Sequence, residues 1–187
     1  MIITITGGSG SGKSALGEAI AQKLTTDTKY YIATMEAFGE EAQKKIAKHR
    51  QMRADKNFQT IECTVNLGTL DLPRGSTAML ECMSNLVANE MFSDAGCFKN
   101  NPSYLPNNKY LEHSIENAIT KMAINCKNLI IITNEVFSDT LEYPRETLEY
   151  IENLGKINQM LFKISDVCIE SVYSIPVYHK GALPWQL

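Results

Sequence analysis

The 187-residue sequence lacks the features that mark several large classes of protein. It has no apolar run near the roughly 18 residues that a membrane-spanning helix needs, so we expect no membrane span. Its formal net charge of −3 gives no general attraction to nucleic acid, and we expect no nucleic-acid partner. It also lacks repeats, low-complexity tracts and any linker that would divide it. Its length suits one domain, which we expect to span residues 1–187.

Cysteine is present, but not in a metal-binding or redox pattern. The five cysteines are scattered, odd in number and never spaced as C-x-x-C, which argues against a zinc site and a thioredoxin-like motif. We interpret them as reduced thiols of a cytoplasmic protein, several of them buried in strands. The first residues run directly into an apolar strand, so we expect no signal peptide.

The most informative motif lies near the start of the chain. Residues 7–14 read GGSGSGKS, the full phosphate-loop pattern G-x-x-x-x-G-K-[ST], with a β-branched run at 2–6 before it and good helix formers at 15–24 after it. Glycines let the backbone N–H groups converge on a phosphate chain, and the helix N-terminus adds partial positive charge. Lys13 is predicted to reach the β- and γ-phosphates, and the Ser14 hydroxyl to bind Mg²⁺. The chain is thus expected to bind a nucleoside triphosphate; the alternative is a glycine-rich turn without a ligand.

Strand-like and helix-like segments alternate along the rest of the chain. Strands separated by helices make βαβ units, so we predict an α/β fold, a three-layer P-loop NTPase with a mostly parallel central sheet. The expected strands are 2–6, 29–33, 58–63, 77–82, 129–133, 167–172 and a short one near 175–178; the expected helices are 15–24, 36–54, 84–92, 109–126 and 145–164, and residues 94–108 are expected to form a long loop.

Polar side chains follow the expected strands at their carboxyl ends, where open parallel sheets bind ligands. Glu81 occupies the place where many P-loop enzymes carry an Asp that orients metal-bound water, so Glu81 and Ser14 are the predicted magnesium site. The alternative for Glu81 is a bond to a neighbouring loop. For Glu135 two interpretations stay open, a functional role and a place in a turn, because Asn134 before it suits a turn. The full set is Thr34, Glu62, Glu81, Asn134 and Glu135.

The basic segment KKIAKHRQMR is the second informative stretch. On a helix, Lys45, His49 and Arg53 share one face, and such a face is most often simply solvated. Cations at this spacing disfavour the imidazolium form of His49, while a neutral imidazole is the nucleophilic form and the cations can receive a phosphate. The arrangement therefore suits a phosphorylated or nucleotidylated histidine. His113 and His179 lack such surroundings and are expected at the surface.

Seven segments, taken in order and spacing, resemble a known family. They are the phosphate loop, YIAT at 31–34, KIAKHRQMR at 45–53, TIE at 60–62, LECMSNL at 80–86, TNEV at 133–136 and GKINQ at 155–159. Together they are similar to the bifunctional adenosylcobinamide kinase / adenosylcobinamide-phosphate guanylyltransferases of cobalamin biosynthesis. The phosphate loop alone is not specific to that family; the H-R-x-x-R segment, the two strand-end glutamates and the N-E-V element together are.

The resemblance implies a RecA-like fold and two reactions. GTP or ATP, with Mg²⁺, phosphorylates the aminopropanol hydroxyl of adenosylcobinamide; GTP then guanylylates a histidine, at the position of His49, and GMP passes to the cobinamide phosphate. Lys13 and His49 are the implied catalytic residues, and the implied assembly is a homo-oligomer, with a trimer among those described. The implied nucleotide contacts are Gly7, Gly8, Ser9, Gly10, Ser11, Gly12, Lys13, Ser14, Ala33, Thr34, Met35, Arg50, Gln51, Met52, Arg53, Glu62 and Glu81.

Departures from the family pattern cluster in the C-terminal half. Phe137 follows the N-E-V element where the family has Gly, and Ser174 stands where a Gly is usual. Nucleotide binding is untouched by these changes. Two other functions stay open: a P-loop small-molecule kinase in which His49 is structural, and a nucleotide-dependent regulatory binding module with 94–108 as its partner surface.

Overall fold

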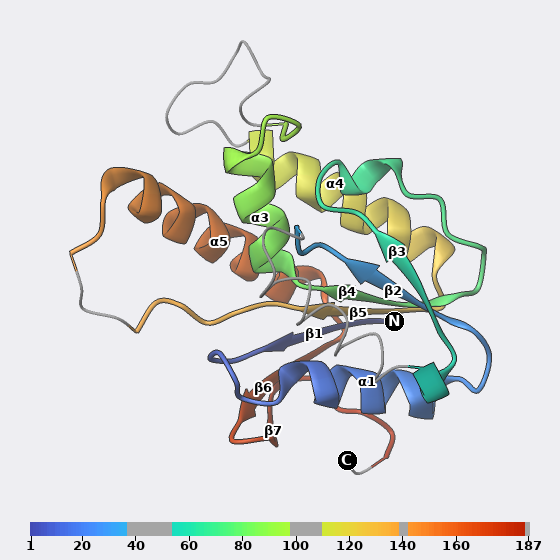
Figure 1. Cartoon of the computed structure of the whole chain (residues 1–187). Helices are drawn as coiled ribbons and strands as arrows, with labels where there is room; N and C mark the ends of the chain where they lie inside the picture. Colours follow the sequence, from blue (N-terminus) through green and yellow to red (C-terminus); the bar gives the residue numbers. More distant parts are fainter. Residues whose placement is uncertain (37–53, 98–109, 139–141, 186–187) are drawn as a thin grey trace.

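A computed structural model of the chain describes residues 1–36, 54–97, 110–138 and 142–185 (Figure 1). Its strands are β1 (Ile2–Thr6), β2 (Lys29–Ala33), β3 (Phe58–Glu62), β4 (Thr77–Glu81), β5 (Asn128–Ile132), β6 (Val167–Val172) and β7 (Ile175–Lys180). Its helices are α1 (Lys13–Leu24), α3 (Met83–Phe92), α4 (Tyr110–Asn125) and α5 (Arg145–Ile164), with short 3₁₀ turns η1 (Ala54–Lys56) and η2 (Leu67–Thr69).

The described strands form one sheet in the order β3-β2-β4-β5-β1-β6-β7. All neighbouring pairs are parallel except β6 and β7, which form an antiparallel hairpin at one edge. Helix α1 covers one face of the sheet, and α3, α4 and α5 cover the other (Figure 1). The mostly parallel, three-layer α/β architecture predicted from the sequence is therefore confirmed.

Two apolar clusters, one on each face of the sheet, hold these layers together. Ile3 and Ile5 of β1 pack on the α1 side, whereas Leu129 and Ile131 of β5 pack on the side of α3, α4 and α5. Every residue of β5 is buried, which fits its nearly unbroken aliphatic sequence, because a parallel strand covered on both faces must be apolar on both. The sheet is thus fixed by burial on both sides.

Most predicted elements agree with the structure to within a residue or two. The strands 2–6, 29–33 and 167–172 and the helix 145–164 have the predicted bounds, while α1 begins at Lys13, two residues earlier than expected. β7 continues to Lys180, beyond the predicted end. The predicted helix over 36–54 and most of the predicted loop over 94–108 lie outside the described residues. Within the described ranges, no helix is both long and apolar enough to cross a membrane.

The core placement of β4 gives a test of the fold. Leu80 is fully buried and is in register with Ile32 on β2 and Ile131 on β5. Leu80→Ala should lower the free energy of unfolding by about 2–5 kcal/mol, because it removes buried methyl groups and leaves a cavity. Urea unfolding followed by circular dichroism measures this. Ile124→Ala is the matched control, since Ile124 on α4 is 76% exposed and its truncation should cost no more than about 0.5 kcal/mol. Equal losses in the two variants would contradict the sheet order.

Candidate active site

The phosphate loop connects β1 to α1 at the carboxyl end of the sheet. Gly12 precedes α1 as its N-cap in the left-handed conformation, with φ of 93°, so the helix begins at Lys13. No side chain caps this N-terminus, which leaves the first backbone N–H groups and the positive end of the helix dipole for an anion. The local geometry matches the role predicted for residues 7–14.

Glycine is required at two positions of the loop because other backbone or side chains lie where a Cβ would be. At Gly7, where φ is 144°, a Cβ would lie 2.6 Å from the carbonyl oxygen of Ser171. At Gly12 it would collide with the Ser174 side chain. Both neighbours belong to the β6–β7 hairpin, so the loop and the hairpin are fitted against each other.

The hairpin also holds the loop by hydrogen bonds. The Ser11 carbonyl oxygen accepts one from Ser171 Oγ at 2.6 Å and one from the Ser174 backbone N–H at 2.9 Å. Tyr173 and Ser174 form the turn with φ of 51° and 65°, as two-residue hairpin turns require. Ser171 was not among the predicted site residues, and Ser174 was named only as a departure from the family pattern; the available signal was a two-residue gap between strand-like segments.

Lys13 lies inside the loop rather than in solvent. Its side chain is 7% exposed, and Nζ donates hydrogen bonds to the carbonyl oxygens of Gly7 at 2.9 Å and Gly8 at 2.6 Å. Burial lowers the pKa of the Lys13 ammonium group below its usual range, and the nearby Cys82 and Glu81 oppose that shift. The lysine therefore lies beside the backbone of the phosphate loop. Because burial disfavours its charged form, a nearby anion such as a phosphate would stabilise the ammonium group.

Ser14 and Glu81, the two residues of the predicted magnesium site, are in contact. Ser14 Oγ donates a 2.5 Å hydrogen bond to Glu81 Oε1, which joins the first turn of α1 to the end of β4. A hydroxyl and a carboxylate are hard oxygen ligands of the kind that Mg²⁺ takes, so these residues fit the ion. Among the described residues, no group of three or more His, Cys, Asp or Glu side chains is placed to hold a metal. Nucleotide phosphates and water would complete the coordination.

Three of the predicted nucleotide contacts lie in register across neighbouring strands. Ala33 on β2 is opposite Glu62 on β3 and opposite Glu81 on β4. Thr34, which follows Ala33, is fully buried; its Oγ1 donates to the Cys82 carbonyl oxygen and accepts from the Cys82 N–H, both at 2.8 Å. This hydroxyl therefore ties β2 to β4. The nucleotide contacts of Ala33, Thr34, Met35 and Glu62 stay predictions.

The residues after β5 shape the wall beside the loop. The Glu135 N–H donates to the Gly7 carbonyl oxygen at 3.0 Å, and the Glu135 carboxylate accepts from the Phe137 N–H and the Ser138 hydroxyl. Asn134 Nδ2 donates to Ser84 Oγ at 2.6 Å. The Glu135 side chain thus makes turn contacts, the alternative stated for it, and Asn134 joins the segment after β5 to α3.

The histidine predictions divide between described and undescribed parts of the chain. His49, with Arg50, Gln51, Met52 and Arg53, lies outside the described residues, so its role stays a prediction. The side chains of His113 and His179 are 64% and 48% exposed, which confirms their predicted surface positions.

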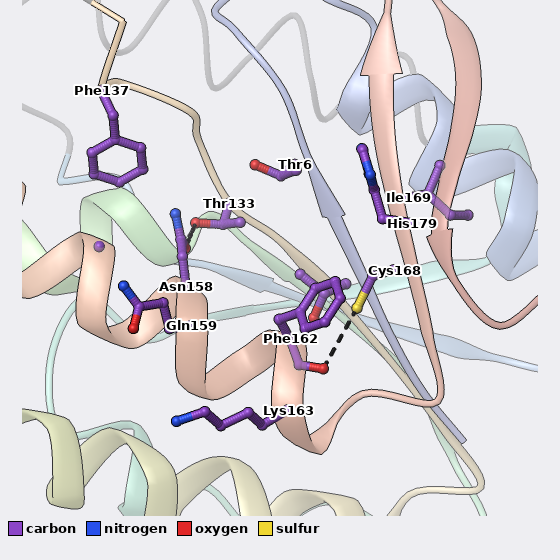
Figure 2. Close-up of a pocket in the computed structure, with 12 residues that line it drawn as sticks. Thr6, Thr133, Phe137, Asn158, Gln159, Phe162, Lys163, Cys168, Ile169 and His179 are labelled. Atoms are coloured by element: carbon purple, nitrogen blue, oxygen red, sulfur yellow. Dashed lines mark hydrogen bonds between the residues drawn. The ribbon is translucent and has the colours of Figure 1, made fainter.

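A cavity of about 570 Å³ lies beside the end of β1, on the face of the sheet that α5 covers (Figure 2). Its lining comes from β1, β6, β7, α5 and the segment after β5: Thr4, Thr6, Thr133, Phe137, Gly155, Asn158, Gln159, Phe162, Lys163, Cys168, Ile169 and His179. It was not foreseen from the sequence, because its walls come from segments far apart in the chain.

A protein-family model matches most of this chain. The model of the cobinamide kinase / cobinamide phosphate guanyltransferase family matches residues 3–178. The chain belongs to this family. The match includes the phosphate loop, the ends of β2, β3 and β4, and the β6–β7 hairpin as far as residue 178. No curated protein sequence matches the chain significantly.

A solved structure shares the fold of this cobinamide kinase / guanyltransferase family member. A prototypical ATPase from the type III secretion system of pathogenic bacteria is 16% identical with a TM-score of 0.54, over 98% of this chain and 59% of that chain. The chain therefore spans 59% of that ATPase, and this likeness supports the RecA-like fold alone. Flagellar accessory protein FlaH from Methanocaldococcus jannaschii is 13% identical with a TM-score of 0.46, over 96% of this chain and 78% of that chain.

The two hydrogen bonds from the β6–β7 hairpin to the Ser11 carbonyl oxygen, called the hairpin brace below, give a first prediction for this site. Ser171→Ala removes one of the two hydrogen bonds to the Ser11 carbonyl oxygen, so the loop should be held less well and nucleotide affinity should fall by about three- to tenfold. Isothermal titration with GTP and Mg²⁺ measures the dissociation constant. Ser171→Thr, which keeps the hydroxyl, should retain most of the affinity. Ser93→Ala is the control, because the buried Ser93 hydroxyl has no hydrogen-bond partner among the described residues. An unchanged dissociation constant for Ser171→Ala would rule out the brace.

Lys13 gives a second prediction, on pH. The triphosphate favours the charged ammonium group, and burial lowers the pKa of Lys13 in the nucleotide-free protein. Affinity should therefore be greatest below that lowered pKa and fall as the pH rises through it, at a lower pH than an ordinary lysine would cause. Titrations from neutral to alkaline pH measure this. Lys13→Arg is the control, since a guanidinium group stays protonated over the whole range, and its affinity should change little with pH. Parallel profiles for the two proteins would show that another group titrates.

Proposed function

We propose that this protein phosphorylates adenosylcobinamide with a nucleoside triphosphate and then transfers GMP from GTP to the product through His49. The observation that carries the proposal is the contact of Ser14 with Glu81 beside the buried Lys13, within a chain whose family match covers residues 3–178. These are the groups that a kinase needs for a magnesium-bound triphosphate, placed by the ends of β1 and β4. The proposed setting is the cytoplasm, and the proposed assembly is a homo-oligomer, such as a trimer.

The first reaction depends on charge neutralisation and positioning. The acceptor hydroxyl oxygen attacks the γ-phosphorus, the bond to the bridging oxygen breaks, and a nucleoside diphosphate leaves while the hydroxyl proton passes to solvent. Lys13 is placed to exchange its hydrogen bonds with Gly7 and Gly8 for phosphate oxygens. Ser14 and Glu81 would hold Mg²⁺, which supplies further positive charge at the phosphates. The loop N–H groups fix the phosphate chain in one orientation.

The second reaction rests on the sequence around His49. The neutral imidazole attacks the α-phosphorus of GTP. The bond between that phosphorus and the oxygen bridging to the β-phosphate breaks, and pyrophosphate leaves. The phosphate oxygen of the cobinamide phosphate then attacks the same phosphorus, the P–N bond breaks, and His49 is regenerated. Forming this intermediate divides one difficult transfer into two easier ones. Arg50 and Arg53 are proposed to bind the phosphates during both steps.

Labelling with GTP tests the second reaction, and assays of adenosylcobinamide phosphorylation in the same variants test the first. Wild-type protein incubated with GTP labelled at the α-phosphate and with Mg²⁺ should acquire an acid-labile, base-stable adduct that mass spectrometry maps to residue 49. His49→Ala should acquire none and should still phosphorylate adenosylcobinamide. His113→Ala is the matched control, because this exposed histidine on α4 should leave both activities unchanged. Lys13→Ala should lose both.

The other outcomes are informative as well. Phosphorylated product without any adduct would indicate a small-molecule kinase in which His49 is structural. Nucleotide binding without turnover of any cobinamide would indicate a regulatory binding module. Equal labelling of wild type and His49→Ala would place the covalent step on another residue.

A further inference from the structure

We propose that the cavity between α5 and the strands β1, β6 and β7 binds adenosylcobinamide, the acceptor of the phosphoryl group. The cavity holds one apolar edge of the corrin ring and the amide arms on that edge. This inference rests on the proposed function and adds to it the place where the acceptor lies.

The position of the cavity is the first argument. One end of it is formed by Thr6, the last residue of β1, and by Thr133, which follows β5. Gly7, the first residue of the phosphate loop, comes directly after Thr6, and its carbonyl oxygen accepts hydrogen bonds from both Glu135 N–H and Lys13 Nζ. A molecule in the cavity therefore has one end next to the phosphate loop. An arm that passes the end of β1 can bring its hydroxyl group to the bound triphosphate.

The apolar walls are the second argument. Phe137 and Phe162 form separate parts of the rim, with Asn158 and Gln159 between them (Figure 2). The two aromatic side chains are 44% and 46% exposed, so each leaves much of a large ring uncovered. The Phe137 ring lies over Gly155, because a Cβ at position 155 would be 3.4 Å from the ring, an ordinary contact distance. Positions 155 and 162 are about 10 Å apart along α5, a span that suits the edge of a large ring rather than a single small group.

The polar groups of the cavity are the third argument. Thr133 Oγ1 donates to Asn158 Oδ1 at 2.7 Å, and Asn158 Nδ2 donates to the Asn134 carbonyl oxygen at 3.1 Å, so this part of the wall is already satisfied. Gln159 and Lys163 lie one turn apart on α5, and neither side chain makes a hydrogen bond or ion pair with another described residue. An amide and an ammonium group beside apolar walls can pair with the carbonyl and NH₂ groups of amide arms.

Charge and size distinguish this ligand from a second nucleotide. His179 is paired with Glu170 at 2.8 Å, and the cavity lacks a glycine loop or a helix N-terminus among its lining residues, so it offers little to a triphosphate. A volume of about 570 Å³ is ordinary for a small-molecule pocket. A whole corrinoid is larger, so the cavity would take part of it and leave the rest in solvent.

Acceptor kinetics test the proposal. Phe137→Ala and Phe162→Ala should each raise the KM for adenosylcobinamide by about tenfold, because each removes an aromatic wall, and should leave the dissociation constant for GTP and kcat at saturating acceptor unchanged. Gln159→Ala should raise the KM by about threefold. Phe92→Ala is the matched control, since Phe92 on α3 is 49% exposed and lies outside the cavity lining. If the KM values are unchanged in both phenylalanine variants while the wild type is active, the cavity does not bind the acceptor. The proposed function would still stand.

Direct binding separates the two proposals. Equilibrium dialysis of the coloured ligand cobinamide against nucleotide-free protein should show weaker binding by Phe137→Ala and Phe162→Ala than by wild type or Phe92→Ala. Binding by wild type without phosphorylation would reject the kinase function and keep the cavity; no binding by wild type would reject both. Sedimentation of the same variants tests the other occupant, a second copy of the chain. Dissociation of an oligomer in the phenylalanine variants, with no change in cobinamide binding, would make the cavity an interface and overturn the proposal.

Discussion

The site is built around one requirement, that a buried ammonium group must have hydrogen-bond partners. Lys13 meets this requirement with two carbonyl groups of its own loop, so the backbone from Gly7 to Gly8 is curled around the side chain that follows it on α1. Such a curl brings the chain against the β6–β7 hairpin, where there is no space for a Cβ. The glycines at 7 and 12, the start of α1 at Lys13 and the fit of the hairpin all meet where this cation is buried.

Strand β1 lies between the phosphate-binding helix α1 on one face of the sheet and the proposed acceptor cavity on the other. Along β1, Ile3 and Ile5 point to the face that α1 covers, and Thr4 and Thr6 line the cavity on the face of α5. Side chains alternate between faces in a strand, so β1 supports the apolar layer under the phosphate-binding helix with one set of residues and borders the cavity with the other. The loop that grips phosphate is simply the continuation of this strand past the edge of the sheet.

How far the sequence predicts the molecule depends on how local each feature is. Helix α5 and strand β6 were predicted with correct bounds because periodicity within one segment determines them, and residues 7–14 form a pattern that needs only its flanking strand and helix. The meeting of Ser14 with Glu81 was predicted because Ser14 belongs to the phosphate-loop pattern and Glu81 follows from the rule on strand ends. Thr34 was assigned to the nucleotide as a residue, a prediction that still stands, and the position of its hydroxyl between the ends of β2 and β4 is a further contact that the sequence did not indicate. The two-residue gap at 173–174 indicated a hairpin, but its contact with the phosphate loop and the cavity could not be predicted, since both depend on β1 lying between β5 and β6, an order that no local pattern specifies.

The hairpin brace has a consequence for synthesis of the protein on the ribosome. The phosphate loop is translated near the beginning, but the groups that hydrogen-bond its Ser11 carbonyl oxygen are at Ser171 and Ser174. A nascent chain that has not yet reached these residues carries the complete glycine motif without its support, and its β1 also lacks the neighbour β6. The support of the phosphate loop is therefore completed late in translation, when β6 and the β6–β7 turn have been synthesised.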